Sequence, residues 1–151
     1  MEIKRFNNDY TEKVLQLLSN NIPYVFPHHP YVYWIMGEYF PSLTYVAIED
    51  DIVVGYICAL HSIEKGNIFI WQLVVDGTFR RVGTAKLLCG KIIYYMRENE
   101  IKTLQITISD KNITSKAFFT ALAEDNSTIL NKIKLVGLDS FNDESAYELR
   151  L

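Results

Sequence analysis

Hydrophobic and polar positions change their period along the chain, and these changes predict the first elements. Residues 2–6 alternate polar and apolar side chains, which is typical of an edge strand. Asp9 lies three residues before Glu12 and ahead of an apolar stripe at helical spacing, so the pair predicts a capping box and an amphipathic helix. The helical pattern fades over residues 19–21.

The next segments predict a loop and a second, short helix. Residues 22–30 contain three prolines and are expected to form a loop. Residues 31–40 are rich in aromatic side chains, and Pro41 predicts the end of that helix because the residue before proline avoids helical geometry.

Three strands are predicted in succession between residues 43 and 75. Two β-rich runs, 43–48 and 52–60, are separated by acidic residues that favour a hairpin turn. A second turn at 64–67 leads into a third run, 68–75. The three runs predict a meander.

The remaining chain alternates helices and strands. Six apolar residues recur at helical spacing: Ala85, Leu88, Cys89, Ile92, Tyr95 and Met96. With a strand at 103–108 they predict a β-α-β unit whose two strands are parallel. A further helix is expected at 112–123, and two closing strands at 129–136 and 146–151. The fold class is therefore α/β, or more loosely α+β, with a mixed sheet.

Composition narrows the function classes. The 151 residues suit a single domain, 1–151, and 22% are charged, with a net charge of −3. This balance does not favour a nucleic-acid partner, and no run is apolar enough to predict a membrane span. Cys58 and Cys89 lie in apolar surroundings without metal-binding spacing, so we expect two buried thiols, no metal and a cytoplasmic location.

The most informative stretch runs from Val75 to Ala85. A strand enters a loop that contains Arg80, Arg81 and Gly83, and a helix follows at once. Such a loop directs backbone N–H groups and the positive end of the helix dipole at one point, which suits a pyrophosphate. The alternative is a tight loop whose arginines are only solvated. Neither G-x-x-x-x-G-K-[ST] nor G-x-G-x-x-G occurs in the chain.

In this stretch the chain resembles the GNAT superfamily of acetyltransferases. Their phosphate-loop pattern, Gln/Arg-x-x-Gly-x-Gly/Ala, is matched by Arg80, Gly83 and Ala85, and the order of predicted elements matches over the whole chain. The resemblance implies a mostly antiparallel mixed sheet of about seven strands with a central splayed parallel pair, and about four helices. Within the superfamily, the segments at 30–40, 70–75 and 107–119 resemble the diaminobutyrate acetyltransferases of ectoine biosynthesis.

The resemblance implies acetyl-CoA as cosubstrate and a set of residues that bind it. Backbone groups of the loop would hold the pyrophosphate, and the end of the preceding strand would pair with the pantetheine arm. The implied cofactor residues are Leu73, Val74, Val75, Arg80, Arg81, Val82, Gly83, Thr84, Ala85, Asn112, Ser115 and Phe119. Asn112 is equally suited to cap the last helix.

The resemblance also implies where the acceptor amine and the catalytic groups lie. Trp71, Tyr31 and Tyr33 would line a pocket for a cation, although each is equally suited to a core position. Glu144 would meet the amine, with a solvated turn carboxylate as the alternative, and Gln72 accompanies Trp71 as a catalytic candidate.

Two positions depart from the family pattern. The tyrosine that protonates the leaving thiolate in many members is Phe119 here, which the ectoine-type enzymes share. Phe26 stands where those enzymes carry an acidic residue, so an amine other than diaminobutyrate is expected.

The expected function is acetyl transfer to the primary amine of a small molecule, of amino acid or diamine type, in a ternary complex. Two alternatives stay open: a protein or peptide acetyltransferase, and a non-catalytic acyl-CoA sensor. The sequence does not decide between a monomer and a homodimer.

Overall fold

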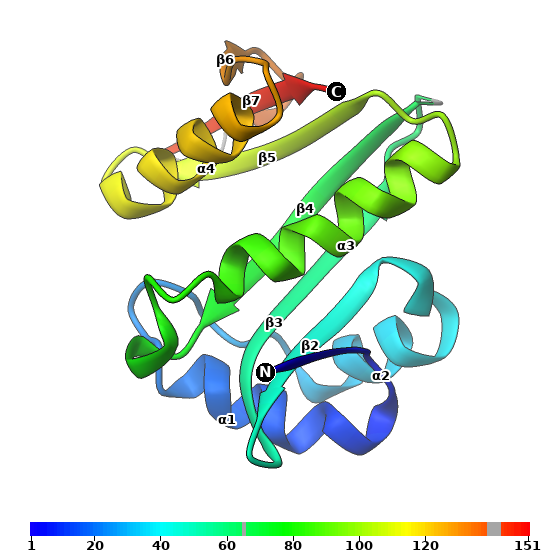
Figure 1. The fold of residues 1–151 in the computed structure, drawn as a ribbon, viewed down its shortest axis with the longest axis vertical. Helices are drawn as coiled ribbons and strands as arrows, with labels where there is room; N and C mark the ends of the chain where they lie inside the picture. Colours follow the sequence, from blue (N-terminus) through cyan, green and yellow to red (C-terminus); the bar gives the residue numbers. More distant parts are fainter. Residues whose placement is uncertain (65, 139–142) are drawn as a thin grey trace. The chain divides into compact units, whose positions relative to one another are not determined.

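The structure is a computed structural model that describes residues 1–64, 66–138 and 143–151 (Figure 1). The strands are β1 (Glu2–Arg5), β2 (Thr44–Glu49), β3 (Ile52–His61), β4 (Asn67–Val75), β5 (Thr103–Ser109), β6 (Asn131–Ile133) and β7 (Glu144–Arg150). The helices are α1 (Thr11–Ser19), α2 (Pro30–Tyr39), α3 (Thr84–Glu98) and α4 (Ile113–Asp125). The strands follow one another in the sheet in the order β1-β2-β3-β4-β5-β7-β6.

The chain divides into two compact units, and the fourth strand belongs to both. The first unit contains residues 1–60 and 72–95, and the second contains residues 61–71 and 96–151. A single domain over residues 1–151 stays a prediction.

In the first unit, β3 is covered on both faces. Gly55 and Tyr56 are neighbours in the strand, so their side-chain directions point to opposite faces. On the Tyr56 face, the rings of Phe6 and Tyr33 meet the Tyr56 ring edge to face, with centroids 5.5 and 5.9 Å away. On the Gly55 face, α3 packs against the strand through Leu88 and other side chains. The first unit therefore places α3 and the start of α2 on opposite faces of the same strand.

The hairpin between β2 and β3 closes in two residues. Asp50 and Asp51 both have positive φ, 47° and 62°, which is the geometry of a tight hairpin turn. Aspartate tolerates this region better than most side chains. The acidic run thus forms the predicted turn.

The second unit contains the parallel pair. β4 pairs with β5 in parallel from Asn67 opposite Thr103 to Ile70 opposite Ile106, and the ladder ends there although both strands continue. β5 and β6 each pair antiparallel with β7. α4 runs along this part of the sheet (Figure 1), and Lys116 Nζ lies 5.6 Å from the centroid of the Tyr147 ring. The mixed sheet with a parallel pair confirms the predicted fold class.

Two sequence predictions are wrong in detail. Asp9 does not cap α1: Asn7 accepts the Asp9 N–H at 2.9 Å, and this earlier bond turns residues 8–10 into a 3-10 helix that leads into α1. The strand expected at 129–136 is only the three residues of β6, because the chain turns again around Gly137, whose φ is +84°. Lys65, in the turn predicted at 64–67, lies outside the described residues.

Both cysteines are buried, as expected, and neither is in a disulfide. Burial raises the pKa of Cys58 to about 11 and that of Cys89 to about 12, so neither thiol is a ready nucleophile at neutral pH. Within the described ranges, no helix has the length and apolar character needed to cross a membrane.

The close packing of α3 on β3 predicts that a larger residue at position 55 lowers the free energy of unfolding. A Cβ built on Gly55 would lie 3.0 Å from Cδ1 of Leu88, 3.1 Å from Cγ2 of Thr84 and 3.2 Å from Cβ of Ala47. We expect Gly55→Ala to lower the free energy of unfolding by about 1–3 kcal/mol, because an extra methyl group overpacks this contact. Urea unfolding measures the change.

Gly90→Ala is the matched control. Gly90 lies within α3, is exposed and has open space where a Cβ would stand. The same substitution should therefore raise the free energy of unfolding by about 0.5–1 kcal/mol, since alanine has less freedom to lose. A Gly55→Ala protein as stable as Gly90→Ala would show that α3 is not tightly seated.

Candidate active site

The loop from Asp76 to Gly83 joins β4 to α3, and its first half is an Asp-centred turn. Asp76 Oδ1 accepts hydrogen bonds from the Thr78 N–H at 2.9 Å and from the Thr78 hydroxyl at 2.6 Å. These two bonds, with a smaller contribution from the Arg80 charge, lower the pKa of Asp76. The turn therefore fixes the direction in which the chain leaves the strand.

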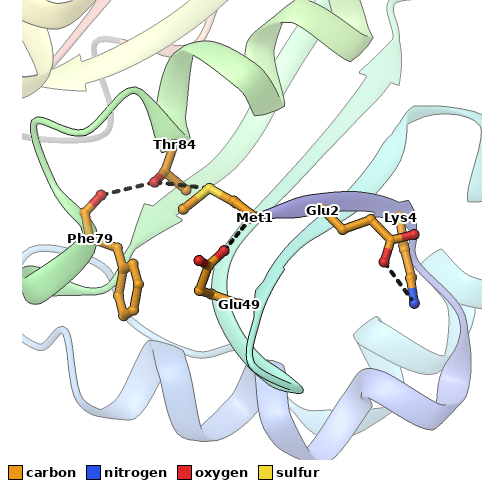
Figure 2. Close-up of polar contacts among 6 residues, drawn as sticks. All are labelled: Met1, Glu2, Lys4, Glu49, Phe79 and Thr84. Atoms are coloured by element: carbon orange, nitrogen blue, oxygen red, sulfur yellow. Dashed lines mark hydrogen bonds and ion pairs between the residues drawn. The ribbon is translucent and has the colours of Figure 1, made fainter.

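Thr84 closes the loop at the first residue of α3. Its hydroxyl donates to the Phe79 carbonyl at 2.9 Å, and the residue is only 1% exposed. Figure 2 shows Met1 beside it, with Sδ 3.4 Å from the Thr84 oxygen and the amino group paired with the Glu49 carboxylate. One buried side chain thus holds the two ends of the 79–84 segment together.

The second half of the loop brings the chain into α3 through two residues of positive φ. Arg81 has φ +63° and Gly83 has φ +95°, and the first helical bond runs from the Leu87 N–H to the Gly83 carbonyl at 2.9 Å. The first N–H groups of an α-helix have no acceptor within the helix and carry the positive end of its dipole. Nothing lies within 4 Å of a Cβ built on Gly83. An anionic diphosphate fits this open helix start.

The Arg80 guanidinium is engaged inside the protein. Nη2 donates to Asn21 Oδ1 at 2.6 Å, Nε donates to the Val75 carbonyl at 3.2 Å, and the guanidinium carbon lies 5.7 Å from the centroid of the Tyr24 ring. The family resemblance implies a cofactor role for Arg80, and these contacts do not follow from the sequence pattern. The cofactor role of Arg80 stays a prediction.

Gln72 connects the middle of β4 to the segment before α2. Its Oε1 accepts from the Tyr33 hydroxyl at 3.2 Å, and its Nε2 donates to the Phe26 carbonyl at 3.0 Å. The Tyr33 hydroxyl in turn accepts from the His28 N–H at 3.0 Å. The sequence feature that indicated this network was a glutamine within an apolar strand, because a glutamine is buried only when its amide is hydrogen-bonded.

The predicted acceptor aromatics differ in exposure. Tyr31 is 60% exposed and stacks on Trp34, with centroids 5.6 Å apart. Tyr33 is 1% exposed, and burial raises its pKa. The Tyr33 hydroxyl is hydrogen-bonded to Gln72. Trp71 is half-buried and belongs to the second unit.

The end of β4 alternates between buried and half-buried positions. Gln72 and Val74 are buried, at 7% and 3% exposure, while Leu73 and Val75 are half-buried. These last residues lie beyond the four-residue ladder with β5.

In the second unit, Asn112 caps α4, which is one of the two roles that the sequence left open. Its Oδ1 accepts from the Ser115 N–H at 3.0 Å. Phe119, on the same helix, is 1% exposed and lies edge to face with Phe118 at 5.0 Å. Phe119 carries no proton to donate, so α4 supplies no acid at this position.

Glu144 begins β7 beside two other carboxylates. Its partial burial raises its pKa, the charges of Asp110 and Asp143 raise it further, and a hydrogen bond from the Thr107 side chain acts in the opposite direction. Asp110 Oδ1 itself accepts from the Ser145 hydroxyl at 2.7 Å. A carboxylate with a raised pKa is suited to accept a proton.

A protein-family model described as the acetyltransferase (GNAT) family matches residues 11–123. The chain belongs to the GNAT acetyltransferase family. The match covers α1 to α4 and so includes the loop of residues 76–83. It confirms the family resemblance that the sequence motif predicted.

Individual GNAT proteins are similar over most of the chain. The L-2,4-diaminobutyric acid acetyltransferase of Nocardia farcinica is 33% identical over 119 residues, which cover 78% of this chain but only 62% of that protein. The N-alpha-acetyltransferase 30 of Schizosaccharomyces pombe is 20% identical over 139 residues, covering 90% of this chain and 91% of that protein.

One solved GNAT structure shares the fold closely. The diaminobutyrate acetyltransferase EctA from Paenibacillus lautus, in complex with L-2,4-diaminobutyric acid and coenzyme A, has a TM-score of 0.89 and 23% identity. The alignment covers 99% of this chain and 93% of that chain.

Proposed function

We propose that this protein transfers the acetyl group of acetyl-CoA to the primary amine of a small molecule, of amino acid or diamine type, by direct attack in a ternary complex. The observation that carries the proposal is the open helix start at Gly83, in the family's phosphate-loop position of a GNAT chain. The similarity to diaminobutyrate acetyltransferases supports a small acceptor. The proposal extends to a cytoplasmic location and to assembly as a homodimer.

The family resemblance assigns the residues that would hold coenzyme A. Backbone groups of residues 81–85 would hold the pyrophosphate at the start of α3, where the helix dipole favours negative charge. The half-buried residues Leu73 and Val75 would present backbone groups to the pantetheine arm beyond the parallel ladder. Asn112, Ser115 and Phe119 would contribute from α4 and its cap.

The reaction needs one proton removed from the amine. Its nitrogen forms a bond to the acetyl carbon while the carbon–sulfur bond breaks, and the thiolate leaves with the electron pair. Because alkyl ammonium groups titrate near pH 10, a base is required at neutral pH, and Glu144 is our candidate. A free thiol has a pKa of about 8.5, so it leaves without the acid that Phe119 does not provide.

The expected acceptor follows from the aromatic rings and from the absence of a carboxylate at position 26. By the family resemblance, the exposed Tyr31 ring and the half-buried Trp71 ring would each offer a face to an ammonium group. Phe26 is 61% exposed and has no charge for a second ammonium group, while its carbonyl is already bonded to Gln72. We therefore expect an acceptor other than diaminobutyrate itself.

A second candidate function is acetylation of a peptide or protein N-terminus. The similarity to N-alpha-acetyltransferase 30 favours it because that similarity spans nearly the whole of both chains. Both functions share the acetyl-CoA loop and differ in the acceptor.

The first prediction is transfer to a small amine. Incubation with acetyl-CoA and separate panels of amino acids, diamines, polyamines and peptides should release free thiol with the small amines, and mass spectrometry should detect the acetylated product. Turnover with peptides alone would favour the second candidate. Binding of coenzyme A by calorimetry without turnover on any panel would instead indicate a sensor.

A second prediction concerns the cofactor loop. Gly83→Glu should abolish coenzyme A binding in calorimetry, because it places a negative charge and a side chain at the open helix start. Gly77→Glu is the control: Gly77 lies in the same loop, also has open space, and does not require positive φ. Equal affinity in the two folded variants would contradict the loop assignment.

A third prediction concerns the base. Glu144→Gln should lower kcat about a hundredfold or more if this carboxylate removes the amine proton. Since the Glu144 pKa is raised from 4.5, its carboxylate form is lost at a higher pH than in an ordinary glutamate as the pH falls. The acid limb of kcat at saturating acceptor should therefore lie above pH 4.5 and flatten in Glu144→Gln.

Glu148→Gln is the matched control for this experiment. Glu148 lies on the same strand, and its side chain, which is 14% exposed, pairs with the exposed Arg150 side chain. Its loss should change kcat little. A wild-type pH profile in Glu144→Gln would exclude this residue as the base.

A further inference from the structure

The segment 20–29 joins α1 to α2 and has little regular structure of its own. Asn21 is the main anchor at its start: the residue is 5% exposed, and its Nδ2 donates to the Leu17 carbonyl at 2.7 Å. The Asn21 carbonyl accepts from the N–H groups of Tyr24 and Val25 at 3.0 and 3.3 Å. Farther along, the Tyr24 and Phe26 side chains are 68% and 61% exposed. The shape of this segment therefore depends on side chains from elsewhere.

The phosphate loop supplies the first of these side chains. Arg80 reaches Asn21 Oδ1 at 2.6 Å and faces the Tyr24 ring, while its Nε is held by the Val75 carbonyl. A guanidinium offers several donors in one plane, so one residue joins three points. Its neighbour Arg81 has the same charge but φ +63°, and its side chain has no hydrogen bond or ion pair among the described residues.

The strand before the phosphate loop supplies the second anchor. The buried Gln72 amide bonds the Phe26 carbonyl directly and the His28 N–H through the Tyr33 hydroxyl. The two bonded backbone groups belong to the residues directly before and after Pro27. Since an unpaired buried amide is costly, the Gln72 bonds hold the segment firmly.

We propose that Arg80 is a positioning residue that couples the phosphate loop to the 20–29 segment through Asn21, and that with Gln72 it sets the acceptor site. The inference rests on the proposed function, because segment 20–29 leads into Tyr31 and Tyr33 of α2. The His29 ring accepts the Tyr31 N–H at 3.2 Å, so the segment and the first turn of α2 move together. The affinity for the acceptor thus depends on Arg80, a residue of the phosphate loop (residues 76–83).

The first arm of the test needs no activity. Hydrogen–deuterium exchange of the segment 20–29 amides, above all Tyr24, Val25 and His28, should rise about fivefold to tenfold in Arg80→Met and Asn21→Leu. Arg80→Lys should behave like Arg80→Met, because a lysine keeps the charge but cannot bond Asn21 and Val75 together. The double variant should show less than the sum of the two single effects, since both substitutions remove the Arg80–Asn21 bond. Each also removes a bond of its own, from Asn21 to the Leu17 carbonyl and from Arg80 to the Val75 carbonyl.

Arg81→Met is the matched control for lost charge in the same loop. It should weaken coenzyme A binding without changing exchange in segment 20–29. Unchanged exchange in Arg80→Lys and Asn21→Leu, or additive effects in the double variant, would overturn the coupling. Gln72→Glu tests the second anchor: it keeps the acceptor for Tyr33, loses the donor to Phe26, and should raise exchange at His28.

The second arm measures steady-state kinetics with the best acceptor of the amine panel. Asn21→Leu should raise the acceptor KM about fivefold to tenfold, with a much smaller change in the KM for acetyl-CoA and in kcat. Faster hydrogen–deuterium exchange in segment 20–29 with an unchanged acceptor KM would overturn the link to the acceptor. If the wild-type protein acetylates no amine, the proposed function fails, and the exchange result still decides whether Arg80 holds the segment.

Discussion

The contact between the first turn of α3 and β3 is the constraint on which the candidate site depends. Gly55 leaves room for the Thr84 methyl group and for Leu88 at the sheet surface. With the helix so close, the Thr84 hydroxyl reaches the Phe79 carbonyl and closes the loop before the helix. A larger residue at position 55 would move the helix start, and with it the N–H groups proposed to meet the pyrophosphate.

Polar bonds hold the loop before α3. Asp76 binds both donor groups of Thr78, and Arg80 returns to the Val75 carbonyl. Positive φ at Arg81 and Gly83 then turns the chain into the helix. The first N–H groups of the helix have no acceptor within it, and Arg80 already has partners within the protein, so the proposed anion contacts are those of the backbone.

Each of the two units contains some of the polar groups considered above. The first unit contributes the loop of residues 76–83 and the bonded pair Gln72 and Tyr33. The second unit contains the α4 cap at Asn112 and the Glu144 carboxylate, whose pKa is raised. No tyrosine replaces Phe119 on α4, so the proposed reaction relies on the acidity of the leaving thiol.

The sequence alone determined the order of elements, the parallel pair and the loop that leads from β4 into α3, because these follow from local period and turn chemistry. It misplaced the cap of α1, since Asn7 and Asp9 compete for the same turn and only geometry decides between them. The partners of Arg80 and Gln72 could not be predicted either. Asn21 is 59 residues from Arg80 and Phe26 is 46 residues from Gln72 along the chain, and only tertiary folding brings such distant polar groups within hydrogen-bonding distance.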